Sequence, residues 1–211
     1  MSKVIAEISM SLDGCVAGPD PSMEEPLGVG GEQVHEWVVA TSSWRDAHGQ
    51  QGGEATPESD MLAEVNDGIG VTIMGRKMFS GGSGPWEDDT NADGWWGPEP
   101  PFRHPVFVLT HHERETTFTF VTDGIESALE QARAAAGDSN IRVAGGAEAI
   151  QQYLAAGLVD ELLLHTAPVF LGGGRRLFDG AAADLTGKFE GTRIVDSTTG
   201  VIHASYKVKD A

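Results

Sequence analysis

Residues 71–78 read Val-Thr-Ile-Met-Gly-Arg-Lys-Met, an apolar run that ends at Gly75 and passes directly into two basic residues. The apolar half predicts a short buried strand, and the second half predicts the start of a helix. A helix N-terminus has free N–H groups and a positive potential, so basic side chains there are unfavourable unless an anion lies between them. Gly75, Arg76, Lys77 and Met78 therefore indicate a phosphate site, with Arg76 expected at the surface. A strand-to-helix turn with solvated charges explains the same residues about equally well.

A second strand-to-helix turn follows at residues 143–148, which read Val-Ala-Gly-Gly-Ala-Glu. Gly145 and Gly146 would let a pyrophosphate approach the backbone closely, next to Ala147 and Glu148. The segment lacks the G-x-G-x-x-G spacing of a dinucleotide fingerprint, and tight helix–sheet packing explains a glycine pair about as often. Two such turns in one chain are more informative than either turn alone.

A third candidate site lies at the end of a predicted strand, where Leu109 is followed by Thr110, His111 and His112. A hydroxyl and two imidazoles could hold the 2′-phosphate of an adenosine. No metal is expected, because neighbours on a strand point to opposite faces and the chain lacks an H-E-x-x-H or cysteine pattern. A solvated loop remains the alternative.

Strands and helices alternate along the chain, which predicts an α/β fold of three layers with a mostly parallel central sheet. The chain ends in two strands that are expected to be antiparallel. Two long loops, 13–34 and 80–104, lie where sheets of this class bind ligands. The expected strands are 3–9, 71–74, 105–110, 141–144, 161–170, 189–195 and 201–208, and the expected helices are 33–43, 56–66, 75–79, 125–136 and 147–156.

Composition limits the partners and the location. The 211 residues carry a formal net charge of −18, which repels nucleic acid and anionic membranes, so neither partner is expected. The length fits one domain over residues 1–211. Cys15 is the only cysteine, so no internal disulfide forms. Because the N-terminus lacks a signal-peptide pattern and no apolar run is long enough to span a membrane, a cytoplasmic location is expected.

The three turns, in this order, resemble the dihydrofolate reductase-like superfamily, and most closely the reductase domain of bifunctional riboflavin-biosynthesis proteins. The resemblance implies a sheet flanked by helices, with NADPH across the carboxyl ends of the strands. It implies that the first turn meets the cofactor phosphates, that the second meets the pyrophosphate and that Thr110 and His111 meet the 2′-phosphate. The matching stretches are Ser11–Gly14, Met74–Phe79, Pro105–Thr110, Ala144–Glu148, Gly157–Glu161 and Pro168–Phe178.

Three residues are candidates for the proton donor. Asp60 is the nearest match to the acid that dihydrofolate reductases carry on the helix before the Met-Gly-Arg turn, although it also fits an acid that favours the helix dipole. His165 lies where the family places a polar residue near the substrate, or is a hydrogen-bonded core histidine. Asp13 lies in the loop that the resemblance places beside the nicotinamide. Asp60 is preferred, then His165, then Asp13.

Three functions compete. The leading one is an NADPH-dependent reductase that transfers hydride to a C=N or C=C bond of a pteridine-like or other heterocyclic substrate. The second reduces a ribosylaminopyrimidine phosphate in riboflavin biosynthesis, although only 14 Lys and Arg are present and no deaminase zinc motif precedes the domain. The third is a non-catalytic nucleotide-binding module on the same fold.

Two further expectations concern surfaces. Residues 168–178 resemble the region that riboflavin-type reductases use near their dimer interface, so a homodimer is expected, with Leu177 and Phe178 exposed. The 80–104 loop carries four large aromatic residues that form either a lid over a flat substrate or packing that anchors the loop: Trp86, Trp95, Trp96 and Phe102.

Overall fold

The fold is an eight-stranded sheet with helices on both faces. The computed structural model describes residues 2–97, 100–179, 185, 187–195 and 197–209. The main-sheet strands are β1 (Val4–Ser11), β3 (Ile69–Gly75), β4 (Val106–Leu109), β5 (Thr119–Val121), β6 (Asn140–Gly145), β7 (Glu161–Ala167), β9 (Phe189–Val195) and β10 (Ile202–Val208). The helices are α1 (Glu36–Ala40), α2 (Ser42–Ala47), α3 (Pro57–Asp67), α4 (Arg76–Ser80), α5 (Ile125–Ala136) and α6 (Ala147–Ala155).

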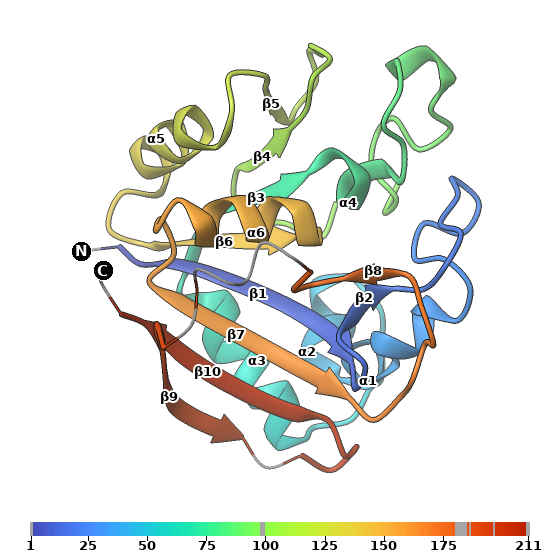
Figure 1. The fold of residues 1–211 in the computed structure, drawn as a ribbon, viewed down its shortest axis with the longest axis vertical. Coiled ribbons are helices and arrows are strands. Elements are labelled where there is room, and N and C mark those ends of the chain that lie inside the picture. Colours follow the sequence, from blue (N-terminus) through green and yellow to red (C-terminus); the bar gives the residue numbers. More distant parts are fainter. Residues whose placement is uncertain (1, 98–99, 180–184, 186, 196, 210–211) are drawn as a thin grey trace.

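The strand order β5-β4-β3-β6-β1-β7-β10-β9 brings the sites of the sequence together (Figure 1). From β5 to β7 every neighbouring pair is parallel, whereas β10 is antiparallel to both β7 and β9. The carboxyl ends of β4, β3, β6, β1 and β7 therefore lie along one edge of the sheet. The predicted α/β fold, with a mostly parallel sheet and antiparallel C-terminal strands, is confirmed.

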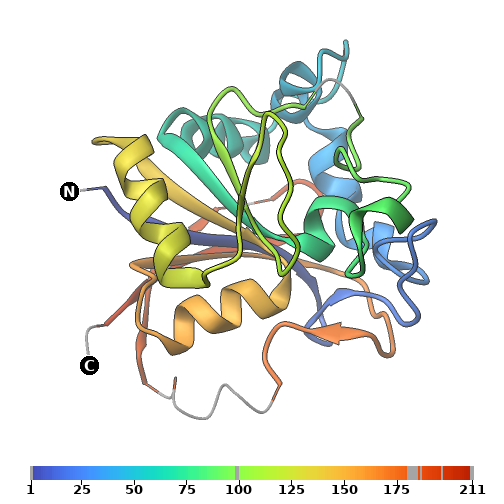
Figure 2. The same ribbon diagram turned by 90° about the horizontal axis from the view of Figure 1, so that it is seen from above.

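The two faces of the sheet differ in chemistry. Figure 2 shows α5 (yellow) and α6 (light orange) on one side and the blue-to-cyan helices α1–α3 on the other. On the first side, Ile125, Leu129, Ile150 and Leu154 pack on apolar strand residues in the largest core cluster. The second side has a smaller apolar cluster that includes Trp37, beside a group of buried polar side chains described below.

Most predicted elements are present, with local differences. Thr56 caps α3 by accepting a hydrogen bond from the backbone N–H of Ser59, as the sequence suggests. The helix expected over 33–43 is broken at Thr41, whose backbone is extended, so it becomes α1 and α2. Three short strands were not predicted: β5, and the antiparallel pair β2 (Cys15–Ala17) and β8 (Arg175–Arg176). No helix within the described ranges is long and apolar enough to cross a membrane.

Candidate functional site

The two glycine turns of the sequence lie side by side at the carboxyl edge. Met74 of β3 pairs with Gly145 of β6. A Cβ atom at Gly75 would lie 3.7 Å from the Gly145 carbonyl oxygen and 3.8 Å from the Gly146 nitrogen. The structure therefore brings together residues that are 70 positions apart in the sequence.

The turn at Gly145 and Gly146 is open. Gly145 has a φ of +120°, which L side chains rarely adopt. A Cβ at Gly146 would meet no heavy atom within 4 Å, and α6 begins at Ala147 without a side-chain cap. The first-turn N–H groups of this nine-residue helix are thus available to an anion. Met78 lies against the same turn, with its sulfur 3.5 Å from the Cβ position of Gly145.

Two basic side chains flank this open turn. Lys77 Nζ is 3.6 Å from Oε1 of Glu148, in the first turn of α6. Arg175 of β8 forms an ion pair with the same carboxylate oxygen. All three side chains are between 41% and 57% exposed, so an incoming anion can reach them. Sequence reasoning found Lys77 and Glu148 but missed Arg175, because only the β2–β8 pairing brings it to this edge.

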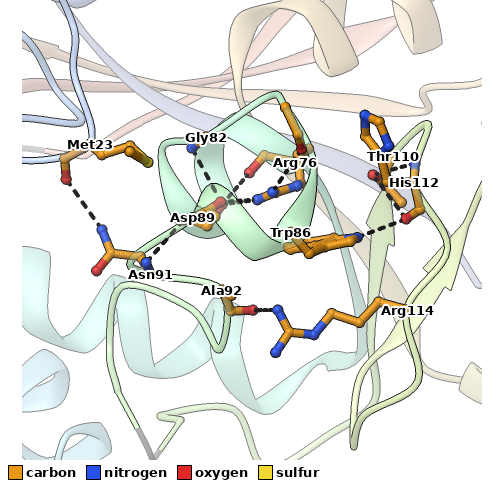
Figure 3. A network of polar contacts seen from close by, with 12 residues as sticks. Met23, Arg76, Gly82, Trp86, Asp89, Asn91, Ala92, Thr110, His112 and Arg114 are labelled. Carbon is orange, nitrogen blue, oxygen red and sulfur yellow. Dashed lines mark hydrogen bonds and ion pairs between the residues drawn. The ribbon is translucent and has the colours of Figure 1, made fainter.

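The turn at Gly75 is closed, which corrects the expected position of Arg76. Its side chain is only 7% exposed and forms an ion pair with Asp89 and a hydrogen bond with Ser80. The Trp86 ring centroid lies 3.3 Å from the guanidinium carbon, and Figure 3 shows the two side chains next to each other. Burial raises the pKa of Asp89, but the bonds from Ser80 and Arg76 outweigh it and lower the pKa below 3.8. The expectation that Arg76 lies at the surface was wrong.

The predicted 2′-phosphate residues are partly engaged within the chain. Thr110 is 7% exposed, and its hydroxyl accepts a hydrogen bond from the backbone N–H of His112 at 3.1 Å. Trp86 Nε1 donates to the His112 carbonyl at 2.9 Å, which ties this loop to the Arg76 network (Figure 3). His111 is exposed at the same edge. Among these residues, His111 is the one left open to a ligand.

Glu58, and not its neighbour Asp60, is the buried acid of α3. Asp60 is exposed on α3 and makes no side-chain hydrogen bond among the described residues, so the geometry gives no support to it as proton donor. Glu58 is 1% exposed, and its carboxylate accepts bonds from Ser197 and Thr198 in the β9–β10 turn. Burial raises the pKa of Glu58, but these bonds hold it at about 2.

Asp13 holds two loops together. Its carboxylate accepts hydrogen bonds from the Ser11 hydroxyl at 2.6 Å and from the backbone N–H groups of Leu171 and Gly172 at 3.1 and 2.9 Å. The Ser11 bond and then the Leu171 bond lower the pKa of Asp13. A carboxyl group kept ionised in this way is a poor proton donor at neutral pH, so a structural role fits it better.

His165 belongs to a buried polar cluster on the α1–α3 face. Its Nε2 is 3.3 Å from Glu7 Oε1, and its Nδ1 is 2.8 Å from Nδ1 of His203. Burial raises the pKa of Glu7, but Arg142 and the His165 ring together hold it at about 2. Within the described residues, no group of three or more His, Cys, Asp or Glu side chains is arranged to hold a metal ion. The three predicted proton donors are not brought into one cluster: only His165 is buried among polar groups.

The aromatic residues of the 80–104 loop pack together. Phe79 of α4 makes edge-to-face contacts with Trp86 and Trp96, and Trp96 contacts Phe102. Trp95 remains 47% exposed. Packing that anchors the loop therefore describes most of this group better than a lid does. Residues 98 and 99 of the loop lie outside the described residues.

The sequence also matches a known family. The family model described as the RibD C-terminal domain covers residues 2–202. The chain belongs to this family. A further relative is the uncharacterized protein YyaP of Bacillus subtilis (strain 168), which is 30% identical over 141 residues, or 65% of this chain and 73% of that protein.

Solved structures share the fold at low sequence identity. A Shewanella sp. PV-4 protein assigned to riboflavin biosynthesis has a TM-score of 0.66 at 19% identity, over 99% of both chains. Dihydrofolate reductase from Enterococcus faecalis, complexed with NADP(H), has a TM-score of 0.57 at 14% identity, over 99% of this chain and 97% of that chain. The diaminohydroxyphosphoribosylaminopyrimidine deaminase/5-amino-6-(5-phosphoribosylamino)uracil reductase of Thermotoga maritima has a TM-score of 0.59 at 13% identity. This chain spans 56% of that bifunctional protein.

These comparisons confirm the dihydrofolate reductase-like fold and the resemblance on which it was based. Membership of the RibD C-terminal domain family also bears out the predicted class, a reductase. The substrate and the roles of individual residues are matters of proposal.

Proposed function

We propose that this chain is an NADPH-dependent reductase, one domain over residues 1–211, that transfers hydride to a C=N or C=C bond of a heterocyclic substrate. The observation that carries the proposal is the open turn at Gly145 and Gly146. It lies at the N-terminus of α6 and beside Gly75 of β3. In a chain of net charge −18, two basic side chains, Lys77 and Arg175, meet at this turn.

The residues present fit the pyrophosphate part of the cofactor. Uncapped N–H groups of α6 would donate hydrogen bonds to the phosphate oxygens, for which there is space above Gly146. Lys77 and Arg175 would then exchange Glu148 for phosphate, and Met78 would line the turn. When bound, NADPH supplies the hydride, and the chain orients it against the substrate.

The fit to the 2′-phosphate is weaker than the sequence suggested. Arg76 is engaged by Asp89, and the Thr110 hydroxyl by His112, so His111 is the remaining contact from the predicted set. A preference for NADPH over NADH is still proposed from the family resemblance. One charge-assisted contact is worth about 1.5–3 kcal/mol, or roughly ten- to a hundredfold in affinity. Isothermal titration calorimetry with both cofactors tests this, and equal dissociation constants would overturn the NADPH preference.

Reduction of a ribosylaminopyrimidine phosphate is the second candidate. It is favoured by membership of the RibD C-terminal domain family and by the solved relative from Thermotoga maritima. The loss of NADPH absorbance in the presence of this substrate or of 7,8-dihydrofolate separates the two candidates. Cofactor binding without turnover on any heterocycle would instead favour a non-catalytic nucleotide-binding module.

A homodimer is also proposed, on different grounds from those first expected. Leu177 is fully buried, which contradicts its predicted exposure, and Phe178 is half-buried. Exposed apolar side chains instead lie on the C-terminal strands, where Ile194 is 76% and Ile202 is 52% exposed. Light scattering of the parent and of an Ile194→Glu variant tests the proposal: a dimeric parent and a monomeric variant are expected, and a monomeric parent refutes it.

A further inference from the structure

The segment that carries Arg175 is held in place by other parts of the chain. Residues 171–177, which we call the strap, read Leu-Gly-Gly-Gly-Arg-Arg-Leu. Glycine loses more conformational freedom than any other residue when a chain becomes ordered. A Cβ atom at Gly172 or Gly173 would meet no heavy atom of the described residues within 4 Å, so packing does not order this part of the strap. The position of Arg175 beside the open turn therefore depends on bonds to other segments.

Asp13 anchors the strap at two places. Its carboxylate accepts hydrogen bonds from the backbone N–H groups of Leu171 at 3.1 Å and Gly172 at 2.9 Å. Its backbone carbonyl accepts a third bond, at 2.9 Å, from Nη1 of Arg176. The Ser11 hydroxyl, which donates to the same carboxylate at 2.6 Å, orients it. Asp13 thus holds both the start of the strap and the residue that follows Arg175.

The end of the strap is attached to α6 and to the turn before β2. Leu177 is fully buried in the largest core cluster, and its N–H group donates to the Gly14 carbonyl at 2.9 Å. Nε2 of Gln151, on α6, donates to the Leu177 carbonyl at 2.7 Å. Gln151 follows Glu148 by three positions, so both side chains lie on the same side of the helix. The strap is therefore attached to the helix whose first turn borders the open turn.

Arg175 lies between these anchors and reaches the first turn of α6. It forms an ion pair with Glu148, and its side chain is 41% exposed. The backbone beside it is tightly packed, because Arg175 pairs with Ala17 of β2 and a side chain at Gly174 would collide with the Ala17 carbonyl (Figure 1). A binding group that is held in place before its ligand arrives loses little conformational entropy on binding. The anchors therefore prepare Arg175 for an anion at the open turn.

We propose that Asp13 and Gln151 are positioning residues for the cofactor, which hold the strap so that Arg175 meets the pyrophosphate at the open turn. Each acts through Arg175 and not by contact with the cofactor. NADPH, by engaging Arg175, should in turn stabilise the anchored strap, since a ligand that binds the ordered form better favours that form. The inference rests on the cofactor site proposed above, and its tests need no turnover.

Amide hydrogen exchange, followed by ¹H–¹⁵N NMR of the full chain, tests the anchors directly. The N–H groups of Leu171, Gly172 and Leu177 report on them, because their acceptors are the Asp13 carboxylate and the Gly14 carbonyl. We expect protection at all three in the parent, and exchange about three- to tenfold slower with saturating NADPH. In Arg175→Ala, saturating NADPH should no longer change the rates. Unprotected amides in the parent, or rates that NADPH leaves unchanged, overturn the proposal.

Calorimetry on a double-mutant cycle separates positioning from general damage to the fold. Gln151→Met removes the bond to Leu177 and should weaken NADPH binding about two- to tenfold, the equivalent of one hydrogen bond. In the Arg175→Ala background the same change should have no further effect, because the strap no longer carries the binding group. Gln152→Met is the matched control and should bind as the parent does, since Nε2 of Gln152 bonds to the Glu148 carbonyl of its own helix. Equal losses from Gln151→Met in both backgrounds refute the proposal.

The sign of the effect of Asp13→Asn is a further test. The substitution removes a negative charge from a chain of net charge −18, which by electrostatics alone strengthens binding of an anionic cofactor. Loss of a strap bond predicts the opposite, a lower NADPH affinity with faster exchange at Leu171 and Gly172. Asp123→Asn, at an exposed acid before α5, shows the effect of charge alone. Tighter NADPH binding in folded Asp13→Asn overturns the positioning role of Asp13.

The outcomes separate this inference from the reductase proposal. If NADPH does not bind in calorimetry, the reductase proposal fails, and inorganic pyrophosphate becomes the probe of the strap. Slower exchange at Leu177 with pyrophosphate in the parent, but not in Arg175→Ala, still supports the strap, whereas unchanged exchange refutes it. Normal NADPH binding with an additive cycle refutes only the positioning roles of Asp13 and Gln151.

Discussion

The two glycine turns look alike in the sequence and differ in the structure. Each joins a buried strand to a helix at the same edge of the sheet, and each was assigned to phosphate. The turn at Gly75 is closed, because Asp89 and Trp86 cover Arg76. The turn at Gly145 is open, with Lys77 and Arg175 beside it.

The difference shows that basic residues at the start of a helix do not reveal whether their anionic partner is a ligand or an acid of the same chain. The positive potential of α4 is matched by a buried acid from a loop of the same chain, so Arg76 stabilises the fold of the 80–92 segment. At α6 the matching acid, Glu148, is exposed and can be displaced. The same local pattern thus supports a structural ion pair in one turn and a proposed ligand site in the other.

Removal of Arg76 should give the largest effect. Arg76→Ala leaves Asp89 buried without a cation, which costs about 3–5 kcal/mol of unfolding free energy. Urea unfolding measures this, and the neighbouring Lys77→Ala, at an exposed side chain, should stay within about 0.5 kcal/mol of the parent. Arg76→Met combined with Asp89→Leu should recover much of the loss. An Arg76→Ala variant as stable as the parent would mean that the turn is open after all.

Acid should weaken the closed turn selectively. The pKa of Asp89 is lowered from 3.8 on folding, so its stabilisation is complete above that value and is lost as the pH falls through the lower folded pKa. The unfolding free energies of the parent and Asp89→Asn should differ by about 1.5–3 kcal/mol at neutral pH. That difference in unfolding free energy should shrink as the pH falls below 3.8. If the difference persists at low pH, the effect of the substitution comes from packing and not from the charge of Asp89.

Particular residues show which parts of the fold can be predicted from the sequence. The long periodic elements were predictable: α5 buries Ile125, Leu129 and Ala132 at helical spacing, and its bounds were predicted correctly. Strands of two or three residues, such as β5 and β8, carry no periodic signal and exist only through their partners.

Site residues were harder to predict, because their surroundings come from distant segments. Glu58 and Asp60 are both acids in the first turn of α3, and the β9–β10 turn decides which of them is buried. Arg76 was misplaced because Asp89 lies in a loop without a pattern. Glu7 and His203 could have been suspected as polar residues inside apolar strands, although nothing in the sequence links them to His165.

Substitutions at the open turn should change the affinity for the cofactor and leave the stability of the fold unchanged. Lys77→Ala and Arg175→Ala should each weaken NADPH binding about tenfold, since each removes a charge-assisted contact to phosphate. Arg133→Ala, at an exposed position of α5, is the control and should bind as the parent does. Calorimetry measures the affinities, and unchanged binding in both variants would place the pyrophosphate elsewhere.

Substitution of Glu148 should give the smallest effect, and its sign shows whether this carboxylate competes with the cofactor at the open turn. Its carboxylate is 53% exposed and pairs with both Lys77 and Arg175, and such surface pairs are worth about 0–1 kcal/mol. Glu148→Gln frees both cations and removes a negative charge next to the phosphates, so NADPH affinity should rise about two- to fivefold, within that energy range. The gain should fall as salt is added, because exposed charges are screened. Glu130→Gln, an exposed acid of α5, should change neither the affinity nor its salt dependence. If Glu148→Gln weakens binding instead, the carboxylate holds Lys77 and Arg175 in place for the cofactor and does not compete with it.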